Sequence, residues 1–143
     1  MMRQNSMSYD YVIDSHAWIE YFVGSDKGKS ASKYIQEGDS ATPTVVIAEL
    51  SRKLLSEIHD GRETVEGRLS RLQFVTSSTT ILDLTQELAT EAGEIDVERK
   101  RKVRDWGLAD SIVLATARHS SGKVVTGDKH FRDLGDEVIF LKS

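Results

Sequence analysis

Four acidic residues of this chain occupy positions from which a folded protein could bring carboxylates together for chemistry. The chain has 23 acidic residues, and most acids in a globular protein are solvated surface charges. Four of them instead adjoin apolar stretches: Asp14, Glu49, Asp110 and Asp128. Carboxylates in contact resist joint ionisation unless a cation lies between them. A cluster of these four would therefore indicate a metal site.

Two of these acids follow short runs of β-prone residues. Val12-Ile13 precedes Asp14, and the run 124–126 ends two residues before Asp128. In open parallel sheets, functional groups collect at the carboxyl ends of the strands. Each acid also has a purely structural explanation, since Asp14 could cap a helix and Asp128 could form a turn beside Gly127.

The other two acids are expected on helices. Asp110 follows Gly107 in the first turn of a predicted helix, where the helix dipole alone favours an acid. Glu49 lies in the apolar stretch 45–50, and an ionised Glu is rarely fully buried without a partner, here a metal or Arg52. Alternatively, Glu49 lies at the solvated edge of the apolar stripe. Of the four acids, Glu49 is therefore the one whose local context gives the weakest support for a role in the site.

The available donors indicate a hard divalent cation. The chain has no cysteine, and its four histidines, His16, His59, His119 and His130, show no metal-ligand spacing. Oxygen-only ligands favour Mg2+ or Mn2+. Such an ion lowers the pKa of bound water and stabilises a phosphate under in-line attack. The four acids together therefore predict metal-dependent hydrolysis of phosphodiester bonds.

Short β-prone runs alternate with helical patterns along the chain. Strands are expected at residues 9–13, 41–44, 79–82, 123–126 and 137–141, with helices between them. This alternation implies right-handed crossovers and a parallel sheet covered by helices on both faces. Ser15, Thr44 and Thr85 are expected to cap helices, and another helix is expected over 62–72. We therefore predict an α/β fold.

Length and composition limit the class of protein. The 143 residues suit a single domain over 9–143 behind a loose polar leader, residues 1–8. No apolar run approaches the length of a membrane span, and the leader lacks a signal-peptide core, which together with the absence of cysteine predicts a cytoplasmic protein. The net charge is −4, so any contact with nucleic acid requires local positive charge or bound metal.

One dense basic run could supply that local charge. It consists of Arg99, Lys100, Arg101, Lys102 and Arg104, shortly before the helix of Asp110. At the rim of the site, it would steer a phosphate backbone. The alternative is a solvated helix end, where cations complement the dipole.

Four segments of the chain resemble the motifs of PIN-domain ribonucleases, and most closely those of VapC-type toxins. The segments are 12–15, 46–50, 108–117 and 125–131, and the resemblance runs from Tyr9 to Leu141. It implies a three-layer α/β/α fold with about five parallel strands. It also implies that the four acids ligate Mg2+ or Mn2+, with Ser15 and Thr126 as supporting residues.

The resemblance further implies an RNA substrate, a homodimer and, for a toxin, a small antitoxin partner. Apolar positions around Trp18 and Ile35 are expected to supply the contact surface. A PIN nuclease in housekeeping RNA processing, without an antitoxin, remains an alternative. An aspartate-based phosphatase or receiver-like domain fits less well, since such phosphatases need a second acid where this chain has His16.

Overall fold

A single parallel sheet forms the centre of the protein. The computed structural model describes residues 8–143, so the leader expected at 1–8 lies outside the described residues except for Ser8. The strand order is β3-β2-β1-β4-β5, and every neighbouring pair is parallel. The strands are β1 (Tyr11–Ile13), β2 (Ser40–Pro43), β3 (Thr80–Leu82), β4 (Lys123–Thr126) and β5 (Val138–Phe140).

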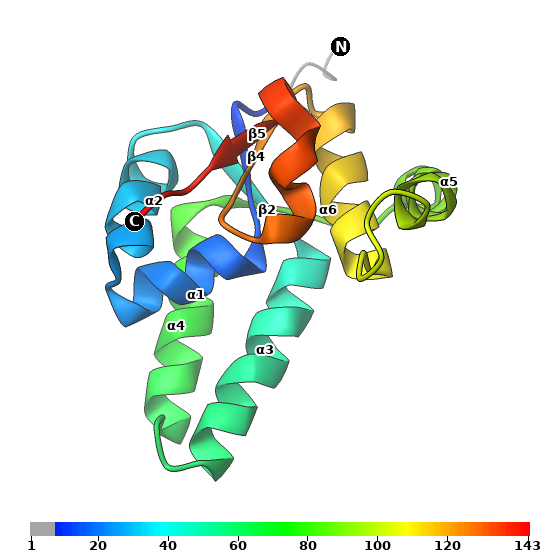
Figure 1. Cartoon of the computed structure of the whole chain (residues 1–143). Coiled ribbons are helices and arrows are strands. Elements are labelled where there is room, and N and C mark those ends of the chain that lie inside the picture. Colours follow the sequence, from blue (N-terminus) through cyan, green and yellow to red (C-terminus); the bar gives the residue numbers. More distant parts are fainter. Residues whose placement is uncertain (1–7) are drawn as a thin grey trace.

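Helices cover both faces of this sheet. Figure 1 shows α1 and α2 on one side, α6 and α5 on the other, and α3 and α4 extending from the sheet as a pair. The helices are α1 (Ser15–Val23), α2 (Asp26–Gln36), α3 (Thr44–His59), α4 (Val65–Ser78), α5 (Gln86–Lys100), α6 (Leu108–His119) and the 3-10 helix η2 (Lys129–Glu137). The predicted three-layer α/β/α fold is confirmed. No helix in residues 8–143 is long and apolar enough to cross a membrane.

The side of the sheet to which successive strands are added changes at β1. This strand pairs with β2 on one side and with β4 on the other, so Val12 lies between Ala41 and Val124. In doubly wound sheets, a crevice opens at such a switch point, outside the carboxyl ends of the strands. Asp14 and Asp128 follow β1 and β4, and the topology therefore brings them to the same edge.

The core lies between the sheet and its helices. Val12, Ile13, Val124 and Val125 have no exposed surface, and the indole of Trp18 is equally buried. Trp18 and Ile35 cannot themselves supply the expected contact surface, because they are 0% and 2% exposed. The large exposed apolar side chains lie elsewhere on the described part: Val23, Leu55, Val65, Leu69, Phe74, Leu84, Val97 and Leu108.

The helix caps differ in part from those expected. Thr85 caps α5, and its hydroxyl accepts the N–H of Leu88 at 3.1 Å, as predicted. The helix expected over 62–72 instead begins at Val65, because Thr64 caps it. Ser15 and Thr44 are the first residues of α1 and α3 rather than their caps. Asp14 holds the N-cap position of α1, yet its carboxylate makes no cap hydrogen bond.

Candidate active site

Asp14 is the buried centre of the acidic cluster. Its side chain is 3% exposed, and its backbone N–H continues the sheet by donating to the Val125 carbonyl at 3.1 Å. Burial raises the pKa of this carboxyl from 3.8 to about 7, against the opposing hydrogen bond from Thr126. The negative charges of Glu49 and Asp110 raise the pKa further. Asp14 makes no ion pair within residues 8–143.

Thr126 connects the two acids that follow β1 and β4. Its hydroxyl donates to Asp14 Oδ2 at 2.8 Å and accepts the backbone N–H of Asp128 at 3.0 Å. The side chain is fully buried at the end of β4. The hydroxyl therefore acts as both donor and acceptor. These two hydrogen bonds hold together the segments of Asp14 and Asp128, which are far apart in sequence.

Glu49 faces the same edge from the second turn of α3. Burial raises the pKa of its carboxyl, while the Ser15 hydroxyl and the positive charge of Arg52 lower it. Asp110 and Asp128 raise this pKa through their charges. Glu49 is thus close enough for the charges of these acids to affect its pKa. The Ser15 hydroxyl hydrogen-bonds to Glu49 and does not cap the helix.

Asp110 joins the cluster from the first turn of α6. Its Oδ2 accepts the backbone N–H of Gly107 at 3.0 Å and lies 3.0 Å from Nδ1 of His130. Burial raises the pKa of Asp110 in spite of both contacts. The acid therefore caps α6, as its position alone would favour, while also facing the other carboxylates.

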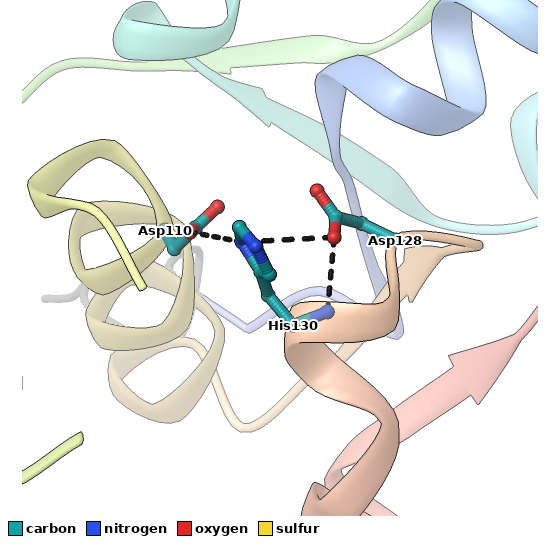
Figure 2. A group of neighbouring side chains, drawn as sticks. All are labelled: Asp110, Asp128 and His130. Carbon is teal, nitrogen blue, oxygen red and sulfur yellow. Dashed lines mark hydrogen bonds and ion pairs between the residues drawn. The ribbon is translucent and has the colours of Figure 1, made fainter. Parts of the chain in front are cut away.

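Asp128 is joined to the same histidine. Its Oδ1 accepts the backbone N–H of His130 at 2.9 Å and lies 3.6 Å from the Nδ1 atom of that ring. Figure 2 shows the His130 ring between the carboxylates of Asp110 and Asp128. Sequence reasoning missed His130 because it sought spacing among histidines. The spacing Asp128-x-His130, directly after a buried strand, was the available signal.

A second histidine joins the start of α1 to the loop after β4. The Nδ1 atom of His16 accepts the backbone N–H of Gly127 at 3.2 Å. A Cβ at position 127 would lie 2.7 Å from the His16 ring, so only glycine permits this approach. Burial lowers the pKa of His16, consistent with a neutral ring that accepts this bond. His16 therefore holds the start of α1, just after Asp14, against the loop that carries Asp128.

The basic run divides into two parts. Arg99 is only 4% exposed and makes a bidentate ion pair with Asp133, 2.8 Å for each bond. The other four members are exposed, and Lys100 pairs with Asp96 at 3.2 Å. Arg99 therefore has no guanidinium surface to offer RNA, and the proposed RNA-contacting set reduces to residues 100–102 and 104.

Arg99 instead supports the turn that carries His130. Its Nη2 donates to the His130 carbonyl at 3.0 Å, and its guanidinium lies over the Trp106 ring at 4.4 Å. The Trp106 indole in turn donates to Ser111 Oγ at 2.7 Å. These contacts tie the end of α5 to α6 and η2, the elements that carry Asp110 and His130.

Comparison with known proteins identifies relatives of this arrangement. The family model described as PIN domain matches residues 11–137. No curated protein matches the chain. The family match covers most of the chain, and its span includes all four acids.

Solved structures share the fold at low sequence identity. A chain of a toxin–antitoxin complex from Klebsiella pneumoniae is 21% identical with a TM-score of 0.68, covering 91% of this chain and 96% of that one. VapC20 from Mycobacterium tuberculosis, described as a sarcin-ricin loop cleaving toxin, is 15% identical with a TM-score of 0.69, covering 94% and 100%. A chain of VapBC2 from Rickettsia felis, solved with a promoter DNA fragment, is 18% identical with a TM-score of 0.67, covering 91% and 96%.

We expect Asp14→Asn to stabilise the protein in EDTA. The folded-state pKa of about 7 exceeds the ordinary 3.8, so the folded state retains a proton that the unfolded state releases, and stability falls as pH rises between these values. Removing the carboxyl should raise the free energy of unfolding by about 1–3 kcal/mol at pH 8 and by less at pH 5. Urea denaturation measures this, with the exposed Asp136→Asn as control. A loss of stability at pH 8 would contradict the account.

We expect Arg99→Lys to destabilise the fold by about 1–3 kcal/mol, since lysine cannot reproduce the bidentate contact and the stacking on Trp106. Arg101→Lys makes the same change at an exposed position and should alter the free energy of unfolding by less than about 0.5 kcal/mol. Thermal and urea denaturation compare the two variants. Equal effects would show that the contacts of Arg99 with Asp133 and Trp106 add no more stability than those of an exposed arginine.

Proposed function

The chain belongs to the PIN domain family, a family of nucleases, and from this premise we propose that it is a metal-dependent endoribonuclease. The observation that carries the proposal is the convergence of Asp14, Glu49, Asp110 and Asp128 at one sheet edge, with Asp14 buried and unpaired by any cation in the described chain. Perturbed carboxyls of this kind are typical of functional sites.

The donors of this site suit Mg2+ or Mn2+. Carboxylate oxygens are the ligands that these hard cations prefer. Burial raises the pKa of Asp14, Glu49 and Asp110, and their mutual repulsion raises it further. A divalent charge would relieve that repulsion. A bound ion would supply an acidified water and charge neutralisation for the phosphate under attack.

The protein's own residues would position that chemistry. Thr126 holds Asp14 by donating to one oxygen and holds the Asp128 backbone through its lone pair. His16 fixes Gly127, and Ser15 and Arg52 favour the ionised form of Glu49. With the carboxylates held in place before the substrate arrives, little reorganisation is required at the reacting phosphate.

RNA would reach the site along the turn that leads from α5 into α6. Figure 1 shows this turn at the same edge of the sheet as the start of α6, which carries Asp110. Arg101, Lys102 and Arg104 are exposed on it. In a chain with a net charge of −4, this local positive charge would attract the phosphate backbone.

We further propose a cytoplasmic toxin that is neutralised by a small antitoxin and forms a homodimer. The fold is shared with chains from toxin–antitoxin complexes, which supports this assignment over housekeeping RNA processing. Exposed apolar side chains on α1 and α4, namely Val23, Val65 and Leu69, would supply protein contacts instead of the buried Trp18 and Ile35.

We expect purified protein to cleave single-stranded RNA in Mg2+ or Mn2+ and to lose this activity in EDTA. Asp14→Asn and Asp110→Asn should each reduce the rate at least about 100-fold, because a ligand to the activating cation is lost. Gel assays of labelled RNA measure the rate, with Asp136→Asn as control. Because Asp14→Asn should be the more stable protein, its inactivity could not result from unfolding. Cleavage that persists in EDTA or in both variants would overturn the mechanism.

We expect the double change Arg101→Glu and Lys102→Glu to weaken RNA binding about tenfold at low salt and to reduce the salt slope by about 2. Fluorescence anisotropy with EDTA present separates this binding from cleavage. Lys53→Glu with Lys123→Glu changes the net charge equally at exposed positions outside the run and should leave the slope nearly unchanged. If both pairs weaken binding equally, the effect belongs to total charge and not to this turn.

A further inference from the structure

His130 presents a nitrogen donor at the mouth of an otherwise carboxylate site. One donor atom each from Asp110, Asp128 and His130 lies within 4.8 Å of the other two. The Nδ1 atom is 3.0 Å from Asp110 Oδ2 and 3.6 Å from Asp128 Oδ1. Figure 2 shows the ring inserted between the two carboxylates.

The three side chains lie close enough for one donor atom from each to reach the same ion. Asp110 and Asp128 each engage one oxygen, Oδ2 and Oδ1 respectively, in hydrogen bonds. Their second oxygens accept no hydrogen bond from any residue in 8–143, so each acid retains a donor for a cation.

The backbone of His130 is held from both sides. Its N–H donates to Asp128 Oδ1 at 2.9 Å, and its carbonyl accepts from the buried Arg99 at 3.0 Å. The neighbouring Phe131 is fully buried against Trp106, with ring centroids 4.9 Å apart. A side chain needed only for surface solubility would not require this support. The ring is therefore preorganised where it faces the acids.

From this geometry we propose that His130 is a nitrogen ligand of the divalent cation and biases the site toward Mn2+ over Mg2+. The inference rests on the metal-dependent nuclease proposed above and specifies its ion. Mg2+ strongly prefers oxygen donors, whereas imidazole is a good ligand for first-row transition metals. A nitrogen donor beside the carboxylates therefore favours Mn2+ over Mg2+.

Pulsed EPR of the Mn2+-loaded full chain tests the bond directly. Wild-type protein should show a histidine nitrogen coupled to Mn2+, identified by its change on 15N-histidine labelling. His130→Gln should lose this coupling, whereas His119→Gln, which alters an exposed histidine paired with Glu87, should retain it. Coupling that is absent from wild type, or that persists in His130→Gln, would overturn the inference.

Calorimetry tests the selectivity. His130→Gln should weaken Mn2+ binding about tenfold and Mg2+ binding by no more than about twofold. His130→Asp restores an oxygen donor, so it should bind Mg2+ at least as well as wild type while the nitrogen coupling stays absent. Equal losses for both ions in His130→Gln would reduce His130 to a positioning residue and overturn the proposal. Failure of wild type to bind either ion, with RNA cleavage that persists in EDTA, would instead reject the nuclease mechanism itself.

Discussion

Repulsion among partly desolvated carboxylates is the constraint around which this protein is organised. Burial raises the pKa of Asp14, Glu49 and Asp110, and their mutual charges add to that effect. Glu57 and Asp133 show the opposite shift, since each bonds to an arginine that lowers its pKa. Carboxylates that pair with arginines are therefore stabilised as anions, whereas burial disfavours the anionic form of the carboxylates at the candidate site. Perturbed pKa values of this kind are typical of functional sites.

The scaffold holds the acids in place through contacts between segments distant in sequence. Thr126 joins the ends of β1 and β4, and His16 joins the start of α1 to the loop after β4. These contacts operate only because the strand order reverses at β1, which places β1 directly beside β4. Helix α6 then brings Asp110 to the edge by its first turn. The switch point thus determines which acids meet, and hydroxyl and imidazole groups determine how closely.

Local patterns in the sequence predicted the elements well and the contacts between them poorly. Alternation of β-prone and helical runs was sufficient for the parallel sheet, because right-handed crossovers leave few alternatives. The strand-end rule located Asp14 and Asp128 for the same reason. The exposure of individual side chains could not be inferred, because helix packing decides which face of a helix meets solvent. Trp18 and Ile35 are buried for this reason. The contact of Ser15 with Glu49 likewise depends on how α1 and α3 pack. His130 was missed since its partners include Asp110, twenty residues earlier.

The basic run shows most directly why residue type alone does not define a role. Five cations that look equivalent in sequence take different environments at the end of α5, whose last turn contains Arg99 and Lys100. Arg99 points inward and bonds to Asp133 and to the His130 carbonyl, whereas Arg101 and Lys102 lie exposed just beyond it. One segment therefore supports the His130 turn through Arg99 and presents exposed positive charge through Arg101 and Lys102. The proposed steering of RNA and the support of the His130 turn would thus depend on a few consecutive residues.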